Sequence, residues 1–284
     1  MNNVEIMTNK DLTIVITTYK SEKTVEDCLN SIEPNIKVIL IENSNNQRFK
    51  THIEDKFSNV ECFLTNDNLG YGKANNIGLK KVTSKYALIL NPDTILRKET
   101  LNNFFIFLKQ DIDFALLGPS QNENPSNLNI LNYDISYLLE TNKIKGFAMF
   151  LNMPKFSNIG FFDENFFLYL EEIDLCKRVM KMNEKVYIDE NIKIFHHGGK
   201  SVDQTFHHEI ELARNWHWMW SFFYFNRKHS GFFYSLIISL PKFFSAIFKV
   251  IFYRNKKNKI YRKRLSGLFN SMIGKPSWYR STLD

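Results

Sequence analysis

Cysteine is scarce in this 284-residue sequence, and its three cysteines are widely separated. Cys28, Cys62 and Cys176 are odd in number and form no CxxC pair. This spacing excludes a zinc ribbon and a disulfide framework, and it favours a reducing compartment. The first ten residues also lack the apolar stretch of a secretory signal. We therefore expect the protein in the cytoplasm.

Acidic residues are nearly absent from residues 226–284, which hold 13 Lys and Arg but a single acid, Asp284. The net charge of +7 is therefore concentrated at this end of the chain. An apolar content of 44% excludes global disorder. We predict a main domain of residues 1–225 and a basic helical extension of residues 226–284. Basic segments of this kind bind nucleic acid or anionic membrane surfaces.

Apolar, β-branched runs predict four buried strands, at residues 12–18, 37–41, 60–64 and 86–90. Helical spacing lies between them, so the pattern indicates a parallel sheet with helices on both faces. Ligands bind such sheets beyond the carboxyl ends of the strands. Polar residues follow each predicted strand there. Further along, we expect a loop at residues 121–132, a strand at 145–151, and two short strands at 186–188 and 192–195.

Residues 231–253 are mostly apolar, but Pro241, Lys242 and Lys249 interrupt them, so the segment makes a poor membrane span. Small and basic residues fall on one helical face: Ser235, Ser239, Lys242, Ser245 and Lys249. A narrow polar stripe with basic flanks favours a helix lying in a membrane interface. Packing on the main domain and an oligomer contact remain alternatives. We do not expect nucleic-acid binding.

Three carboxylates lie close together at Glu171, Glu172 and Asp174, after a loop rich in phenylalanine. Carboxylates partly shielded from water have raised pKa values and act as bases near neutral pH. A further carboxylate, Asp93, follows the predicted strand at residues 86–90. A base together with a carboxylate at a strand end suggests a metal-assisted transferase. The alternative is an acidic cluster with a purely structural role.

Seven short motifs occur in a fixed order along the chain: TTYKS at 17–21, ENS at 42–44, NLGYGKANNIG at 68–78, NPD at 91–93, GFFDE at 160–164, EEID at 171–174 and HHGGKS at 196–201. In this order they resemble the family 2 glycosyltransferases, in particular the bacterial rhamnosyltransferase-like branch. The likeness covers residues 12–201. It implies the GT-A fold, an α/β fold with a Rossmann-like mixed sheet, here followed by the basic helical extension.

The resemblance implies an inverting transfer from a nucleotide-sugar with Mg²⁺ or Mn²⁺ as cofactor. Asp93 matches the metal-binding position of the DxD-type motif, and Asn91 stands where its first Asp can stand. His196 matches a position that can supply a second metal ligand. The structural alternatives are a turn-capping aspartate and a hydrogen-bonded histidine at a strand end.

Glu172 stands where the family usually has the Asp of its Glu-Asp pair, so the resemblance makes Glu172 the general base, with Glu171 as the alternative. We assign Asp174 to structure, paired with Arg178 one helical turn away. The resemblance assigns donor binding to a larger group: Thr18, Tyr19, Glu42, Asn68, Gly70, Lys73, Asn76, Asn91 and Asp93. Among these, Glu42 is expected to recognise the base. We expect Trp216, Trp218 and Trp220 in a core or facing a membrane rather than holding a sugar.

The expected protein is a glycosyltransferase on the inner face of the plasma membrane. It would transfer a sugar, with L-rhamnose from dTDP-rhamnose as the leading donor, to a polyprenyl-diphosphate-linked or other glycan acceptor during surface polysaccharide or O-antigen synthesis. One alternative is the same fold with UDP-galactose or a UDP-N-acetylhexosamine. The other is a catalytically weak relative that binds nucleotide-sugar or membrane within an assembly, and an oligomer is compatible with either.

Overall fold

The computed structural model describes residues 11–122, 133–197, 207–254 and 256–280. The chain divides into two compact units. Unit 1 consists of the described parts of residues 1–69, 73–162 and 175–202, and unit 2 of the described parts of 70–72, 163–174 and 203–284. The expected loop at residues 121–132 and the motif at 196–201 lie largely outside the described residues. The predicted boundary after residue 225 falls inside a helix of unit 2, and the two predicted domains stay a prediction.

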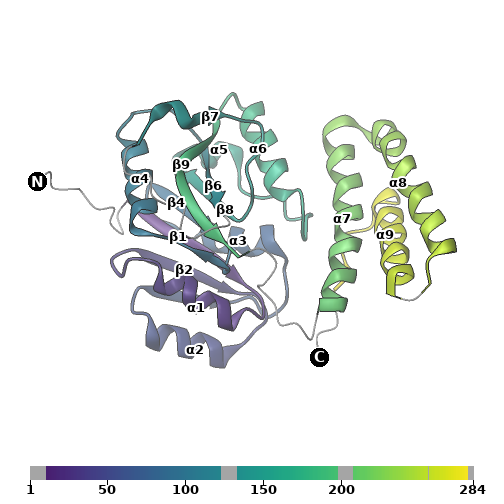
Figure 1. The fold of residues 1–284 in the computed structure, drawn as a ribbon, viewed down its shortest axis with the longest axis horizontal. Coiled ribbons are helices and arrows are strands. Elements are labelled where there is room, and N and C mark those ends of the chain that lie inside the picture. The colour runs from purple at the N-terminus through teal and green to yellow at the C-terminus, as the bar shows by residue number, and fades with distance from the viewer. Residues whose placement is uncertain (1–10, 123–132, 198–206, 255, 281–284) are drawn as a thin grey trace, which may run out of the picture. The chain divides into compact units, whose positions relative to one another are not determined.

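Unit 1 is built on one nine-stranded mixed sheet (Figure 1). Its parallel half contains β1 (Leu12–Thr18), β2 (Lys37–Glu42), β3 (Val60–Leu64) and β4 (Tyr86–Leu90), in the order β3-β2-β1-β4. These are the four strands that the apolar runs predict. β1 and β2 are almost wholly buried, as expected for strands with helices on both faces.

The second half of the sheet corrects the parallel sheet that the apolar runs indicated, and it confirms the mixed sheet that the resemblance implied. It contains β5 (Thr94–Ile95), β6 (Leu116–Asn122), β7 (Leu138–Glu140), β8 (Ala148–Asn152) and β9 (Val186–His196). β8 runs antiparallel to both β4 and β6, which makes the sheet mixed. The two short strands expected at 186–188 and 192–195 are one continuous strand, β9.

Helices cover this sheet (Figure 1): α1 (Glu22–Asn30), α2 (Gln47–Lys56), α3 (Tyr71–Leu79), α4 (Lys98–Leu108), α5 (Phe156–Ile159) and α6 (Glu171–Lys181). Two short 3-10 turns, η2 (Ile135–Tyr137) and η3 (Met153–Lys155), complete the unit. Aromatic rings fill the core below α4. The rings of Phe104 and Phe150 stack with their centroids 4.6 Å apart, and Tyr86 and Phe114 extend the stack. This packing ties α4 to β4 and β8.

Unit 2 contains three long helices, α7 (His207–Ser230), α8 (Phe232–Phe252) and α9 (Lys256–Met272). A Cβ at Gly267 would lie 2.2 Å from the carbonyl oxygen of Trp216, so glycine allows α7 and α9 to approach closely. Trp216 and Trp220 are buried, and their indoles donate to Ser266 and to the Lys275 carbonyl. These two tryptophans are core residues.

Candidate active site

Asp93 and His196 meet in unit 1, as the resemblance predicts for a metal site. β5 pairs antiparallel with β9, which sets Thr94 opposite His196, and the His197 amide donates to the Asp93 carbonyl at 3.0 Å. Asp93 Oδ1 then lies 3.2 Å from His196 Nε2, and the carboxylate is buried. Phe147 stacks on the imidazole with ring centroids 4.9 Å apart, which fixes its orientation.

The two side chains fit a divalent cation. Among the described residues, Asp93 Oδ1 and His196 Nδ1 are buried without a hydrogen-bond partner, and the close approach of Oδ1 to Nε2 lacks hydrogen-bond geometry. Two ligands at about 2.1 Å from one octahedral ion are about 3 Å apart, which is the separation of these two atoms. Within the described residues, no group of three or more His, Cys, Asp or Glu side chains could hold a metal. The other ligands would therefore come from the donor and from water.

The end of β1 offers a second unsatisfied group. Thr18 is buried, its carbonyl accepts from the Asn43 amide at 2.8 Å, and its hydroxyl has no hydrogen-bond partner in the part of the chain that the structure describes. Tyr19 follows it, half-buried. A buried hydroxyl without a partner costs free energy unless a ligand satisfies it. Donor binding by Thr18 and Tyr19 stays a prediction that this orphaned hydroxyl favours.

Glu42 holds the loop that follows β2. Both oxygens of its buried carboxylate accept hydrogen bonds: one from the backbone and hydroxyl of Ser44, the other from the Asn46 amide at 2.6 Å. The predicted recognition of the base by Glu42 is not tested by these contacts. They give the residue a loop-ordering role that the motif alone does not reveal.

Asn43 links the polar segments beyond β2 and β3, a role that the motif did not reveal. Its side-chain oxygen accepts from Thr65 at 3.0 Å and from the Leu69 amide at 2.9 Å, and its amide nitrogen donates to Asn68 at 3.0 Å. It thereby joins the end of β2 to the chain beyond β3. Its place directly after a buried strand is the one signal that would have pointed to it.

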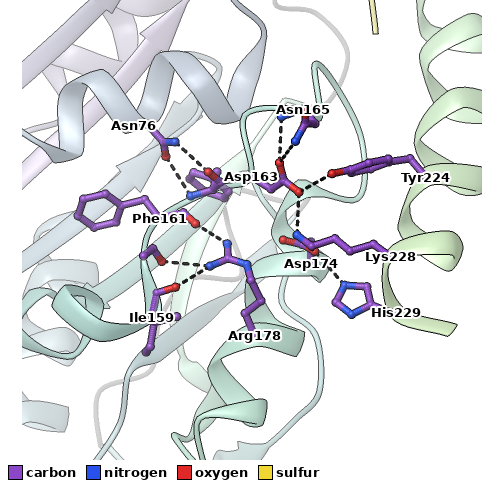
Figure 2. A network of polar contacts seen from close by, with 12 residues as sticks. Asn76, Ile159, Phe161, Asp163, Asn165, Asp174, Arg178, Tyr224, Lys228 and His229 are labelled. Carbon is purple, nitrogen blue, oxygen red and sulfur yellow. Dashed lines mark hydrogen bonds and ion pairs between the residues drawn. The ribbon is translucent and has the colours of Figure 1, made fainter. Parts of the chain in front are cut away.

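The Asn76 amide is used by the protein backbone. Its nitrogen donates to the Phe162 carbonyl at 2.9 Å, and its oxygen accepts from the Phe162 amide at 3.0 Å. This pair clamps the chain before the acidic motif, as Figure 2 shows. Asn91 is half-buried, as is Lys73 on α3. Donor binding by these three residues stays a prediction.

Unit 2 brings together Glu171, Glu172 and Tyr71. Burial raises the pKa of Glu171 well above its ordinary value, and repulsion from Glu172 raises it further. Burial also raises the pKa of Glu172. The pKa of the Tyr71 phenol is raised by burial and by the negative charge of both carboxylates. One oxygen of Glu171 is buried and has no hydrogen-bond partner within the described residues. The raised pKa values make the two carboxylates stronger bases than exposed glutamates.

The backbone before these carboxylates is strained. Tyr169 and Leu170 have φ angles of 73° and 69°, in the left-handed region that side chains rarely adopt. Gly70, with φ of 81°, lies so close that an added Cβ would be 2.2 Å from the Phe167 carbonyl oxygen, which accepts from the Tyr71 amide. Strain of this kind persists where surrounding contacts enforce it, and it is frequent at active sites.

Those contacts come from α7 (Figure 2). Asp174 is fully buried, 2.6 Å from Lys228 Nζ and 2.8 Å from His229 Nε2. Lys228 also lies 2.7 Å from Asp163, which accepts from the Tyr224 hydroxyl at 3.0 Å. Ion pairs therefore hold the phenylalanine loop (residues 163–170) and the first turn of α6 against α7.

The expected pair between Asp174 and Arg178, one helical turn apart, stays a prediction. Arg178 donates to the carbonyls of Ile159, Gly160 and Phe161, as Figure 2 shows for Ile159 and Phe161. Lys228 and His229, more than 50 residues away along the chain, are partners of Asp174 that helical spacing does not predict.

Curated proteins resemble this chain over most of its length. The model of glycosyl transferase family 2 matches residues 13–176. The chain is 24% identical over 217 residues to the low-salt glycan biosynthesis hexosyltransferase Agl10 of Haloferax volcanii, covering 69% of each protein. It is 23% identical over 252 residues to the rhamnosyltransferase WbbL of Escherichia coli K12, covering 76% of this chain and 92% of that one.

Solved structures share the fold. The mannosyltransferase PcManGT of Pyrobaculum calidifontis, in complex with GDP-Man and Mn²⁺, matches 94% of this chain and 90% of its own, with a TM-score of 0.58 at 10% identity. GalNAc-T7 with UDP, GalNAc and Mn²⁺ matches 66% of this chain with a TM-score of 0.52 at 11% identity. This chain spans 43% of that protein. Identities this low support the fold alone.

Proposed function

The chain belongs to glycosyl transferase family 2 and has the GT-A fold, and from this premise we propose that it is a metal-dependent, inverting hexosyltransferase. The observation that carries the proposal is the buried pair of Asp93 Oδ1 and His196 Nε2, 3.2 Å apart and not hydrogen-bonded. A nucleotide-diphosphate leaving group needs a concentration of positive charge, and this pair is suited to holding a cation.

Asp93 and His196 would hold Mg²⁺ or Mn²⁺. When bound, the ion neutralises the charge that develops on the departing diphosphate. Because two side chains are a sparse ligand set, cation and nucleotide should bind together and each should strengthen the other. The two solved structures described above hold Mn²⁺ together with UDP or GDP-Man, which supports this expectation.

Glu172 is the general base in this proposal. Glu171 is the more deeply buried of the pair, so it retains its proton to higher pH, and Glu172 ionises first. The ionised Glu172 takes the proton of the acceptor hydroxyl. That oxygen forms a bond to C1 of the sugar while the bond from C1 to the diphosphate oxygen breaks. A single displacement of this kind inverts the configuration at C1.

We propose L-rhamnose from dTDP-rhamnose as the first donor to test, because the similar WbbL protein is named as a rhamnosyltransferase. The acceptor that we propose is a polyprenyl-diphosphate-linked glycan at the inner face of the plasma membrane, during surface polysaccharide or O-antigen synthesis. The hexosyltransferase name of Agl10 supports glycan assembly more broadly and leaves UDP-sugars as the competing donors.

The donor site is tested by thermal shift with dTDP, UDP, GDP and CDP, each with and without Mn²⁺. A ligand at a hundred times its Kd stabilises the protein by about 2.7 kcal/mol, so one nucleotide should raise Tm by several degrees only when Mn²⁺ is present. Asp93→Asn and His196→Ala should abolish that shift. His52→Ala, which changes an exposed histidine of α2, should keep it. A metal-independent shift, or none in the wild type, would overturn the proposed metal site.

The catalytic assignment is tested with the nucleotide-sugar that the panel selects. Glu172→Gln should lower kcat by about 10²–10⁴ while the nucleotide shift is retained. If Glu171→Gln has the larger effect, Glu171 is the base. A protein that binds nucleotide with Mn²⁺ but transfers no sugar in the wild type would instead be a binding component of an assembly.

A further inference from the structure

The helix α8 presents its large apolar side chains to the outside of unit 2. Six of them recur at helical spacing on one face: Phe233, Ile237, Leu240, Phe244, Phe248 and Ile251. Their exposed fractions range from 42% for Leu240 to 79% for Phe233. A soluble helix turns such a face toward its own core. Six large apolar residues on one exposed face therefore require a partner.

The opposite face of α8 carries small residues and is the packed one. Ser235, Ser239 and Ala246 are buried, and Lys242 and Lys249 lie over the rings of Phe222 on α7 and Tyr261 on α9. Four of the five residues of the polar stripe that the sequence predicts are thus buried or contact the neighbouring helices, while Ser245 is exposed. Small side chains inside and large apolar ones outside are the arrangement of helices that contact lipid. α8 therefore packs its small residues inward and exposes its large apolar residues, which is the reverse of an amphipathic helix in a soluble protein.

Charge identifies the partner. The turn after α8 and the start of α9 carry exposed basic side chains at Arg254, Lys256, Lys257 and Lys259, and residues 226–283 contain no acid. Tyr234 and Tyr253 are exposed at the two ends of α8, where tyrosines in a membrane interface reach the headgroups. An apolar face bordered by basic residues matches an anionic bilayer surface.

We infer that α8 lies in the plane of one leaflet of an anionic membrane, with its outward phenylalanine face among the acyl chains and the basic residues of α9 at the headgroups. By length and composition α8 is the one described helix that could cross a membrane. Crossing is incompatible with its packing, because α9 contacts α8 and carries six Lys and Arg at residues 256–264. Hydrocarbon can therefore reach only the outer face of α8.

This inference deepens the proposed function and rests on it only for the lipid-linked acceptor. The lipid contact itself rests on the exposure and charge of α8 and α9. Anchoring in one leaflet would hold the enzyme where a polyprenyl-diphosphate glycan presents its sugar. Transfer to a short water-soluble acceptor should not need the contact.

The test is flotation of the full chain with vesicles of phosphatidylcholine alone or with 30% phosphatidylglycerol. The wild type should float with the anionic vesicles. The double variant Phe244→Glu, Phe248→Glu should bind at least tenfold more weakly, because it charges the immersed face. Its control is Ile135→Glu, Leu139→Glu, which changes two apolar residues of unit 1 that are about equally exposed and should float like the wild type.

The basic residues are tested separately with Lys256→Gln, Lys257→Gln, Lys259→Gln. Each charge near an anionic surface is worth about a fivefold change in partition, so this triple variant should also lose at least tenfold, and less at high salt. Bound wild type should be released by alkaline carbonate, as an in-plane helix would be. Retention after carbonate would indicate a spanning helix and overturn the inference.

The nucleotide shift, measured on the same samples without vesicles, separates this inference from the proposed function. Flotation without any nucleotide shift supports the membrane surface while the donor site fails. A nucleotide shift without flotation overturns the membrane surface alone. A stable wild-type dimer that Phe244→Glu, Phe248→Glu converts to a monomer, with no vesicle binding, would show that a second copy of the chain covers the face.

Discussion

The ion pair between Asp174 and Lys228 should be the strongest single tie between the phenylalanine loop and α7. Asp174 is fully buried, while the Lys228 side chain is about one quarter exposed. Removing one partner of a buried pair costs about 3–5 kcal/mol. His229 remains beside Asp174 and water reaches Lys228, so we expect Lys228→Met to cost about 2–3 kcal/mol, below that range or at its lower limit.

A double-mutant cycle measures the interaction itself. Urea unfolding of wild type, Asp174→Asn, Lys228→Met and the double variant should give a coupling energy of about 1–3 kcal/mol. A control cycle pairs Asp174→Asn with Lys185→Met, whose ionic partner is Glu140. Its coupling should fall within about 0.5 kcal/mol of zero, because substitutions at sites that share no partner add.

The control for a surface pair is Lys185→Met. Lys185 contacts Glu140 at 2.9 Å, but both side chains are about half exposed, so this change should cost about 0–1 kcal/mol. Amide hydrogen exchange of residues 163–170 gives a local readout, and Lys228→Met should speed it selectively. Equal coupling in the two cycles would refute the assignment of Lys228 as a partner of Asp174.

Three further predictions concern groups near the acidic segment. Gly70→Ala should destabilise the fold by more than 2 kcal/mol in urea, because its Cβ would meet the Phe167 carbonyl; Gly160→Ala, with φ of 72° and open space, should cost only about 1 kcal/mol. Burial raises the pKa of Glu171 in the folded protein above its ordinary value of 4.5. The protonated Glu171 side chain therefore contributes its full stabilisation below pH 4.5, and this contribution is lost as the pH rises through the pKa of the folded state. Glu171→Gln should flatten the resulting slope of the unfolding free energy against pH. Burial lowers the pKa of His217 to about 3, so its ring should give no nitrogen NMR titration between about pH 5 and 8, and stability should fall as pH drops below the ordinary value of 6.5; titration in that window would mean that the ring is not buried.

The strands β1 to β4 could be predicted because each is a continuous apolar run, and only strands buried on both faces combine such runs with so few polar positions. The later part of the sheet could not be predicted in this way. β9 contains Asp189 and Asn191, which read as a break between two strands. Both are buried in the folded chain, where Asp189 accepts from Tyr133, 56 residues earlier, at 2.7 Å. Hydrophobic periodicity cannot reveal a hydrogen bond between residues so far apart in sequence.

In the candidate site, too, some contacts could be predicted from the sequence and others could not. The motifs predicted that Asp93 and His196 lie together. In the structure, the pairing of β5 with β9 brings together the two segments that carry them. The contacts of Glu42 and Asn76 could not be predicted, because a carboxylate or amide in a motif can hydrogen-bond either to a ligand or to nearby backbone. In the structure, both side chains hydrogen-bond to backbone groups.

Helix α8 shows where periodicity stops being informative. A period of 3.6 residues predicts that one face carries serine and lysine and the other carries phenylalanine and isoleucine, but it does not say which face is packed. In water the apolar face would turn inward, because burying it lowers the free energy most. In unit 2 the buried Ser235, Ser239 and Ala246 face inward instead, and their small size allows α8 to approach α7 and α9 closely. That packing leaves the phenylalanine face without a protein partner within the described part of this unit. The orientation is therefore favourable only where the surroundings of α8 are themselves apolar, which is the condition that a lipid leaflet meets.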